Sequence, residues 1–261
     1  MKRALVILLA ILMMVPLAAC GKSDSDDWAY IKNNKKLIIG FTDYEPMNYY
    51  ENGKLVGFDT EFAEAVCAKL GITPEFIIIN WDTKETELAA KKIDCIWNGL
   101  TVTEERKKNM SFSDSYLRNE QVVVIRDADS GIYTSAASLA GKTVVAETES
   151  AGESAIEADL KDSNYVAVDS QAKTLLEVKA GTAEAAVIDL TMANAMTGPG
   201  TEYADLKIVT SIKMQPEEYA IGFRLGSSCV KTFNDTIKGL SSDGTIGTIA
   251  DKYDLSDLLI K

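Results

Sequence analysis

Short apolar runs alternate with amphipathic segments along most of this chain, and they do so in two successive sets. Short apolar runs are typical of buried strands, and an apolar stripe every three to four residues is typical of helices. The first set comprises strands expected at 37–41, 76–79 and 95–97 and helices expected at 59–70 and 84–92. The second comprises strands expected at 143–146, 165–168 and 185–188 and helices expected at 153–160 and 172–180. This alternation predicts an α/β fold with two central sheets, each flanked by helices.

Local signals mark the ends of some of these elements. Asn52-Gly53 predicts a hairpin turn, because both residues tolerate the left-handed backbone that a tight turn needs. Asp59 is expected to cap the helix that follows, and Gly71 lies just past the expected end of that helix.

Two further strand-like runs, 121–125 and 219–223, bracket the second set. We expect them to be paired crossovers between two lobes. Lobe 1 is then formed by residues 28–119 and 217–261, and lobe 2 by the inserted residues 120–216. Two such lobes enclose a cleft at the carboxyl ends of their strands, where α/β proteins bind ligands, and two connecting strands allow hinge closure.

The amino terminus has the pattern of an export signal. A basic start is followed by an uncharged apolar run, 4–19, which is shorter than the ~20 residues of a transmembrane helix. Leu17-Ala18-Ala19-Cys20 resembles the bacterial lipobox. That resemblance implies a signal peptide at 1–19, fatty acyl chains such as palmitate on Cys20, and a tether at 20–27 on the extracytoplasmic face of the cell membrane, in the periplasm or at the cell surface. An ordinary cleaved signal, with Cys20 as an ordinary thiol, is the alternative.

Composition disfavours several classes of function. The formal net charge is −12, and −14 without the two basic residues of the signal, which argues against nucleic acid as a partner. The absence of histidine removes Ser-His-Asp and Cys-His catalysis and the commonest zinc ligand. We therefore expect no enzymatic activity, no metal and no cofactor. No later segment approaches 18 uninterrupted apolar residues, so we expect no integral membrane segment in the body.

Three cysteines follow Cys20 at wide, irregular spacings. Cys67 lies on the apolar side of a predicted helix, Cys95 lies in a predicted strand, and Cys229 is far from both. The spacings indicate neither a disulfide framework nor a metal site. Buried thiols and a Cys67–Cys95 disulfide are both left open.

A candidate anion site follows the strand expected at 95–97. In Thr101-Val102-Thr103-Glu104-Glu105-Arg106, Thr103 can cap a helix and Arg106 falls in its first turn. The helix dipole disfavours a cation there, so the arginine makes most sense if its guanidinium and nearby free amides bind an anion such as a carboxylate. A capped helix with a surface arginine is the alternative.

Several short motifs occur in order along the chain. They are Leu37-Ile-Ile-Gly40, Tyr44-Glu-Pro46-Met, Gly57-Phe58-Asp59 at a helix start, Thr101-x-Thr103-x-x-Arg106, Phe112-Ser113-Asp114-x-Tyr116, and Gly239-Leu240 followed by Asp243-Gly244-Thr245. Together they resemble the polar amino-acid solute-binding proteins of bacterial ABC importers, family 3 of the extracellular solute-binding proteins. The resemblance implies a two-lobed periplasmic-binding-protein-like fold of type II that captures a polar L-amino acid between its lobes and delivers it to ABC permease and ATPase subunits. We expect the protein to be a monomer.

The resemblance places a carboxylate site across the cleft. Arg106 matches the arginine that binds the ligand α-carboxylate, with the Thr101 hydroxyl and the backbone of Gly99 to Thr101 as further donors. In lobe 2, Ser150 and the Ala151 amide match the remaining donors. A cap on the following helix is an alternative role for Ser150, and the two roles are compatible.

The resemblance also places a partner for the ligand α-ammonium. Asp189 matches the family carboxylate with this role, whereas Glu149 replaces a usual glycine and does not carry over. A zwitterion held between Arg106 on one lobe and Asp189 on the other would favour the closed state. Capping a helix near Thr191 is the alternative role for Asp189.

Aromatic residues are expected to cover the ligand. Tyr44 and Trp81 match the family positions that contact the ligand side chain, although an aromatic residue after a strand is commonly a core residue. We expect Trp97 in the core, and we expect Trp28 to anchor the amino-terminal end to lobe 1.

Selectivity depends on residues near the same pocket. Glu147 matches a family position that can face the ligand side chain, and Asp43, Glu45 and Asn98 are close to the pocket in sequence. All four are polar and three are acidic. They favour a polar side chain, with a lean toward a cationic one, unless they point to solvent.

Two other functions are compatible with the same resemblance. Cyclohexadienyl dehydratases share the general fold, and a cleft carboxylate such as Glu147 could act as an acid. A sensory lipoprotein could use the same closure to signal to a receptor. The matching amino-acid site and the lipid anchor favour capture and delivery.

Overall fold

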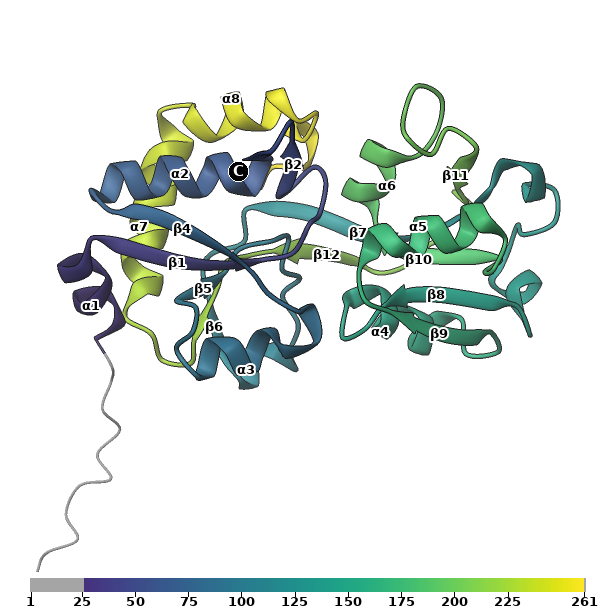
Figure 1. Ribbon diagram of the computed structural model, residues 1–261, viewed down its shortest axis with the longest axis horizontal. Coiled ribbons are helices and arrows are strands. Elements are labelled where there is room, and N and C mark those ends of the chain that lie inside the picture. The colour runs from purple at the N-terminus through teal and green to yellow at the C-terminus, as the bar shows by residue number, and fades with distance from the viewer. Residues whose placement is uncertain (1–25, 261) are drawn as a thin grey trace, which may run out of the picture.

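The computed structural model describes residues 26–260 of the 261-residue chain. They form two lobes that lie side by side and are joined by strands running between them (Figure 1). The two-lobed α/β architecture predicted from the sequence is confirmed. The predicted signal peptide and the proposed lipidation site Cys20 lie outside the described residues.

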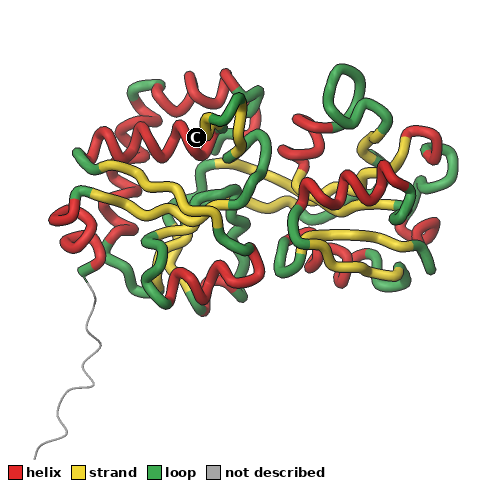
Figure 2. Tube along the Cα trace, in the orientation of Figure 1, coloured by secondary structure: helices red, strands yellow, loops and turns green. Residues whose placement is uncertain are grey.

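Lobe 1 is built on a five-stranded sheet. Its elements are α1 (Asp27–Asn34), β1 (Lys36–Phe41), β2 (Tyr49–Glu51), β3 (Lys54–Val56), α2 (Phe58–Leu70), β4 (Thr73–Ile78), α3 (Lys84–Ala89), β5 (Cys95–Ile96), β6 (Met110–Phe112), β13 (Gly222–Arg224), α7 (Cys229–Ser242) and α8 (Thr245–Lys252). The strand order is β4-β1-β5-β13-β6, in which β4, β1 and β5 are parallel and β13 is antiparallel to its neighbours. Helices α2, α7 and α8 pack together along one side, and α3 lies on the other (Figure 2).

Lobe 2 contains a second sheet. Its elements are the long strand β7 (Leu117–Arg126), which enters from lobe 1, and β8 (Thr143–Glu147), α4 (Ala151–Asp159), β9 (Asn164–Val168), α5 (Gln171–Ala180), β10 (Ala185–Asp189), α6 (Leu190–Met196) and β11 (Leu206–Ile208). The strand order is β11-β7-β10-β8-β9, with β10, β8 and β9 parallel and β7 antiparallel to both neighbours. The site-bearing ends of β8 and β10 therefore point the same way, toward lobe 1.

The two lobes are connected by β7 and β12 (Pro216–Tyr219), which pair antiparallel from Pro216 opposite Glu120 to Tyr219 opposite Leu117. The prediction that 121–125 and 219–223 pair with each other is wrong, because 121–125 pairs with β10 inside lobe 2 and 222–223 pairs with β5 inside lobe 1. The apolar runs mark the parts of these strands buried within each lobe. The paired segment between the lobes is polar, and the predicted lobe limits fall within it.

The cores of the two lobes differ in character. In lobe 1, Phe62 packs edge-on against Trp97 with ring centroids 5.1 Å apart, and Phe223 packs against Phe233 at 4.9 Å. Trp97 is fully buried, as predicted. In lobe 2, the cluster on the α4 side is mostly aliphatic, with Val123, Val144 and Val187 from three neighbouring strands. Large aromatic groups therefore stabilise lobe 1 in particular.

The amino-terminal end of the described chain is part of lobe 1. Asp26 caps α1 through Oδ1, which accepts from the Ala29 amide at 3.0 Å. Asp27 forms a buried ion pair with Arg224 at 3.0 Å, and Arg224 pairs with Asp94 at 3.1 Å. The predicted tether at 20–27 is thus too long, because its last two residues already belong to the folded body. Trp28 packs edge-on against Phe233 of α7, which agrees with its expected anchoring role.

The cysteines within the described residues are free and buried. The open question of a Cys67–Cys95 disulfide is therefore answered in favour of thiols. Burial raises the pKa of Cys67 to about 12, so this thiol is unreactive at neutral pH. From residue 26 to residue 260, no helix has the length and apolar character needed to cross a membrane.

Candidate ligand-binding cleft

A small cavity lies between the lobes, at the carboxyl ends of strands from both sheets. Its lining residues from lobe 1 are Thr42, Tyr44, Trp81, Asn98, Gly99, Thr101 and Arg106, and those from lobe 2 are Glu147, Ser150, Ala151, Gln171 and Asp189. All ten residues predicted for the site are among them. The free volume is about 10 Å³, roughly the space of one water molecule. The lobes are therefore closed, and a ligand can enter only when they separate.

Arg106 is the cation of this cavity, and its side chain is held by carbonyl groups. It is 7 % exposed, Nη1 donates to the Thr101 carbonyl at 2.8 Å, and Nη2 donates across the cleft to the Glu149 carbonyl at 3.1 Å. Within residues 26–260 no carboxylate forms an ion pair with it, and burial lowers its pKa. A buried guanidinium without an ion-pair partner is costly, so the site favours an anion there.

The segment that carries Arg106 is shorter than predicted. Thr103 Oγ1 accepts from the Arg106 amide at 3.1 Å, as expected of a cap, but only a single 3₁₀ turn, Arg106–Lys108, follows. A turn of this length has little dipole. The attraction for an anion therefore comes from the buried guanidinium itself and not from a helix end.

Polar residues inside lobe 1 fix the loop that carries Gly99. Asp59 was expected to cap α2, but Gly57 stands at the cap position and the Asp59 side chain points elsewhere. Its Oδ2 accepts from the Gly99 amide at 2.7 Å and from the Tyr116 hydroxyl at 2.9 Å. Gly99 has φ +57°, and a Cβ there would lie 2.6 Å from a ring carbon of Tyr44. The loop is thus held in a conformation that only glycine fits.

Asn98 supports the site from behind. Its Oδ1 accepts from the amide and the hydroxyl of Thr42 at 3.0 and 2.7 Å, and its Nδ2 donates to the Thr42 carbonyl at 2.9 Å. These bonds orient the segment after β1 against the segment after β5. Asn98 therefore lines the cavity, while its amide positions Thr42.

Asp189, the last residue of β10, is surrounded by neutral donors. Its Oδ1 accepts from Asn119 Nδ2 at 2.6 Å, Gln121 Nε2 at 2.7 Å and the Tyr219 hydroxyl at 2.7 Å, and Gln171 Nε2 donates to Oδ2. It stands before α6 but makes no side-chain cap bond to that helix, so the alternative capping role is not adopted. No cation of the described residues pairs with this carboxylate.

Ser150 and its neighbour Ala151 place a helix start at the cavity. Ser150 caps α4 through Oγ, which accepts from the Glu153 amide at 3.2 Å, while the residue also lines the cavity. Glu149, just before it, has φ +59°, a backbone conformation that glycine adopts more easily. Its carbonyl receives both Arg106 and Lys84 Nζ, the latter at 3.0 Å.

The two predicted aromatic walls are in place. The Tyr44 hydroxyl reaches Thr191 Oγ1 of lobe 2 at 2.5 Å and the Tyr219 hydroxyl at 2.7 Å, so it bridges the lobes. The Trp81 ring lies 4.8 Å from Lys84 Nζ and 6.0 Å from Arg106 Cζ, measured to the ring centroid. An indole with two cations nearby is suited to cover charged or aliphatic groups.

Of the acidic residues considered for selectivity, only Glu147 reaches the cavity. It is 3 % exposed, and its Oε1 has no hydrogen-bond partner among the described residues. Burial and the nearby Asp189 carboxylate raise its pKa to about 8. Asp43 is exposed, and neither it nor Glu45 lines the cavity. The chain after β1 alternates in direction, so Thr42 and Tyr44 point inward and Asp43 points outward.

Sequence reasoning missed a group of polar residues on the connecting strands β7 and β12. Glu217 of β12 accepts from Thr101 Oγ1 at 3.1 Å, Asn119 Nδ2 at 2.5 Å and Gln121 Nε2 at 2.8 Å. Burial and Asp189 raise its pKa to about 8. Glu217 lies close to Asn119 and Gln121 because β12 pairs with β7, and the sequence does not reveal this pairing. Gln171 and Thr42 were also missed, although a polar residue beside a predicted strand end is a weak signal for each.

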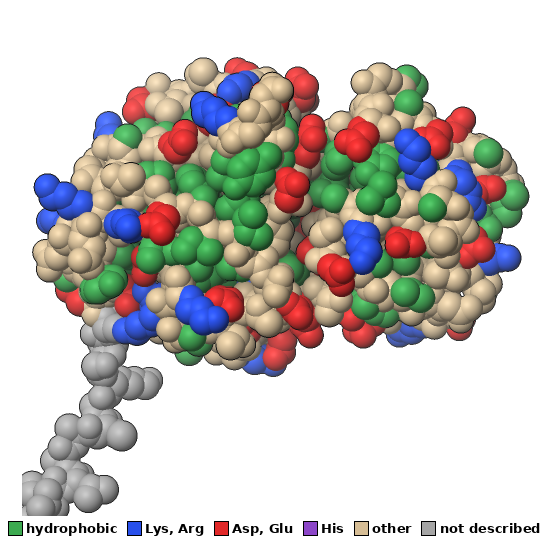
Figure 3. Space-filling model, viewed as in Figure 1, with side chains coloured by type: hydrophobic (Ala, Val, Ile, Leu, Met, Phe, Trp, Pro, Cys, Tyr) green, Lys and Arg blue, Asp and Glu red, His purple; other side chains and the backbone are tan. Residues whose placement is uncertain are grey.

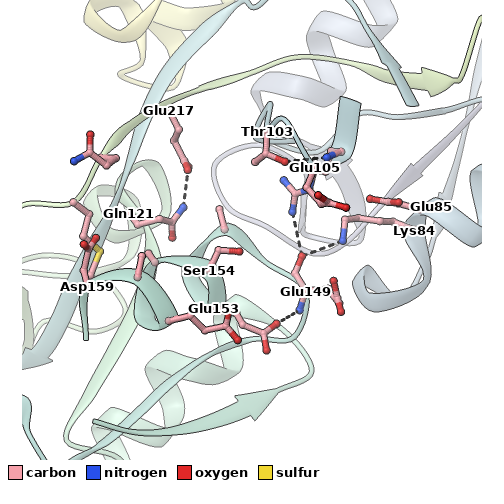
Figure 4. A pocket seen from close by; sticks show the side chains of 17 residues that line it. Lys84, Glu85, Thr103, Glu105, Gln121, Glu149, Glu153, Ser154, Asp159 and Glu217 are labelled. Atoms are coloured by element: carbon pink, nitrogen blue, oxygen red, sulfur yellow. Dashed lines mark hydrogen bonds between the residues drawn. The ribbon is translucent and has the colours of Figure 1, made fainter. Parts of the chain in front are cut away.

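A second, larger cavity of about 420 Å³ lies on the other side of Arg106. Figure 4 shows Lys84 reaching from lobe 1 toward Glu149, and Glu217 close to Gln121. Most of its charged lining residues are acidic, and it lacks both Asp189 and the aromatic walls. The smaller cavity is therefore the better site for a ligand with both an anionic and a cationic group.

A two-lobed α/β protein that closes over an unpaired guanidinium and unpaired carboxylates is, by architecture, a protein that binds a small charged ligand between its lobes. The model of the bacterial extracellular solute-binding proteins, family 3, matches residues 37–256, and the chain belongs to this family.

Individual relatives match over nearly their full length. The arginine-binding extracellular protein ArtP of Bacillus subtilis is 30 % identical over 97 % of this chain and 98 % of its own. An ABC uptake transporter substrate-binding protein from Streptococcus pneumoniae, solved with bound histidine, is 32 % identical with a TM-score of 0.82, covering 92 % of this chain and 100 % of its own. An ancestral amino-acid-binding protein described as a precursor of cyclohexadienyl dehydratase is 26 % identical with a TM-score of 0.79, covering 87 % and 98 %.

Proposed function

We propose that this protein captures a polar L-amino acid in the interlobe cleft and delivers it to the permease of an ABC importer. The observation that carries the proposal is the pair Arg106 and Asp189, which line one cavity from opposite lobes and have no ion-pair partner among residues 26–260. The two charges of an amino acid complement this pair. A relative with bound histidine and a relative named for arginine support an amino acid as ligand.

The ligand α-carboxylate would bind Arg106 together with the Thr101 hydroxyl and the backbone of Gly99 to Thr101. Closure would add Ser150 and the Ala151 amide, and Asp189 would receive the α-ammonium. Tyr44 and Trp81 would cover the rest. Because the two lobes contribute different charges, the ligand gains most of its contacts only in the closed form, which is the condition for ligand-driven closure.

The test is thermal unfolding of the body from residue 26 onward, refolded to remove copurified ligand, against the twenty amino acids plus ornithine and cystine. A ligand at a hundred times its Kd adds about 2.7 kcal/mol, which corresponds to a shift of roughly 5 to 10 °C for a chain of this size. We expect such a shift with one or a few polar amino acids. A flat profile across the whole panel would refute the proposal.

The cellular setting is part of the proposal. We propose a lipid anchor on Cys20 and a position on the extracytoplasmic face, with permease and ATPase subunits as partners and a monomeric binding protein. Cys20→Ser should release the protein from membranes, and metabolic labelling with palmitate should mark only the parent protein. Copurification of a receptor kinase in place of a permease would instead favour a sensory role.

An enzymatic role is the second candidate. Glu147 is a buried carboxyl group whose pKa is raised to about 8, a value suited to a general acid at neutral pH. An ancestral amino-acid-binding protein described as a precursor of cyclohexadienyl dehydratase has a similar structure, so this fold is compatible with the enzymatic role. We expect no turnover, because the carboxylate and ammonium partners suit capture of an intact amino acid. Incubation with prephenate or arogenate, followed by ultraviolet absorbance of an aromatised product, separates the two roles.

A further inference from the structure

The acidic side chains that line the closed cavity outnumber the cationic ones, and adding a simple zwitterion does not change this. Arg106 is the only cationic side chain among the lining residues, whereas Asp189 and Glu147 are both acidic. The α-carboxylate and α-ammonium of an amino acid would complement Arg106 and Asp189. Glu147 is then left without an ion-pair partner among residues 26–260, because the buried cation Lys84 near it donates instead to the Trp81 and Glu149 carbonyls at 3.1 and 3.0 Å.

Glu147 is built into the site as an unsatisfied group. It ends β8, its side chain is 3 % exposed, and its Oε1 has no hydrogen-bond partner among the described residues. Asp189, by contrast, accepts from four neutral side chains. A buried carboxyl oxygen without a donor is costly, and it is usually explained by a ligand or a function. The missing donor must come from whatever fills the cavity.

Another cavity with acidic lining residues lies next to Glu147. Trp81 lines both the closed cavity and a neighbouring one, whose other lining residues are Asn80, Asp82, Thr148 and Asp169. Thr148 directly follows Glu147, so the two cavities meet at this strand end. The outer cavity has two exposed carboxylates, of which Asp169 is already paired with Lys173 at 2.9 Å. Figure 3 shows Asp and Glu side chains on both sides of the groove between the lobes.

We infer that the amino acid bound by this protein carries a cationic side chain, which lies along the Trp81 indole and pairs with the Glu147 carboxylate. This inference rests on the proposed function and names its ligand class. The cation supplies the donor that Glu147 Oε1 lacks and balances the charge of the cavity. The Trp81 face stabilises the aliphatic stem or the cation itself. Asp82 adds an exposed carboxylate at the entrance.

The experiment compares ligands that differ in charge but not in length. Calorimetric titration of the ligand-free body uses L-arginine and its neutral ureido analogue L-citrulline, and L-lysine and its neutral hydroxyl analogue L-6-hydroxynorleucine. We expect at least one cationic ligand to bind about 100-fold more tightly than its neutral analogue. In Glu147→Gln this preference should fall below about fivefold, with the affinity for the neutral analogue unchanged. Glu64→Gln, an exposed position on α2 outside the cavity lining, is the matched control and should change the preference by no more than about threefold.

The outcomes separate this inference from the proposed function. If L-citrulline, L-glutamine or L-cystine binds the parent protein as tightly as the cationic ligands, the inference is wrong and amino-acid capture stands. If Glu147→Gln weakens both members of a pair equally while its melting temperature is unchanged, Glu147 only shapes the pocket and the inference is also wrong. If no amino acid binds the parent protein, the proposed function itself fails.

Discussion

The two lobes contribute to the cleft in different ways. In lobe 1 the loops that carry the site are held by hydrogen bonds within the lobe, since Asp59 holds the Gly99 amide and Asn98 holds Thr42. In lobe 2 the site carboxylate Asp189 is held partly by Asn119 and Gln121 on the connecting strand β7. Lobe 1 is therefore a preformed half-site, whereas the half-site of lobe 2 is coupled to the hinge. We expect a ligand to dock on lobe 1 first and to draw lobe 2 over it.

The largest effect should come from the cation of lobe 1. Arg106→Ala removes the partner of the ligand α-carboxylate and should cost about 3–5 kcal/mol of binding free energy, because the carboxylate is then buried without its cation. Calorimetry with the best ligand of the panel measures this. Lys107→Ala, an exposed neighbour, should bind normally. Equal affinity of Arg106→Ala and the parent protein would show that the carboxylate binds elsewhere.

The corresponding change in lobe 2 should be smaller and should also affect closure. Asp189→Asn keeps the shape but removes the charge that faces the α-ammonium, for an expected loss of about 2–3 kcal/mol. Small-angle scattering with saturating ligand should show a less complete compaction than in the parent protein. If Asp189→Asn loses affinity but still closes fully, the proposed coupling of this residue to the hinge is wrong.

The preformed character of lobe 1 can be tested through its stability. Asp59→Ala leaves the Gly99 amide and the Tyr116 hydroxyl without their acceptor and should destabilise the protein by about 1–3 kcal/mol. Chemical denaturation measures this difference, with exposed Glu64→Ala on the same helix as control. A loss no larger than that of the control would mean that the loop is held by other contacts.

A last effect concerns the pH dependence of stability. The pKa of Glu147 rises from 4.5 to about 8 in the fold, so between these values the unfolded chain releases a proton that the folded chain retains. The free energy of unfolding of the ligand-free parent protein therefore falls as pH rises through this window, relative to Glu147→Gln. The melting temperature of the variant should therefore gain steadily on that of the parent between pH 5 and pH 8. A constant difference across this range would contradict a buried, raised Glu147.

Much of the architecture could be predicted from the sequence, because alternating apolar runs report burial directly. The strands at β1, β8 and β10 follow from such runs, whereas ten of the twelve lining residues were predicted from the resemblance to family 3 of the solute-binding proteins. What could not be predicted depends on pairing between distant segments. The register of Glu217 opposite Asn119 places a carboxyl group behind the site, and nothing in either local sequence indicates it.

Errors arose where a local rule met a competing tertiary contact. Aspartate commonly caps helices, but the Asp59 carboxylate accepts a hydrogen bond from the buried Gly99 amide instead. Asp43 and Glu45 are next to Tyr44 in the chain, yet the alternation of an extended segment directs them away from the cavity. Proximity in sequence is therefore a poor guide to which acid meets a ligand.

The buried ion pairs that join Asp27 to Arg224 and Arg224 to Asp94 fasten the start of the body to the sheet of lobe 1. If Cys20 carries the anchor, only five residues lie between it and Asp26, a reach of at most about 20 Å. Lobe 1 would then be the lobe attached to the membrane through the tether, and lobe 2 would move relative to it. A tether this short would confine the protein to a thin layer above the membrane. There the protein and a permease would meet by lateral diffusion in two dimensions.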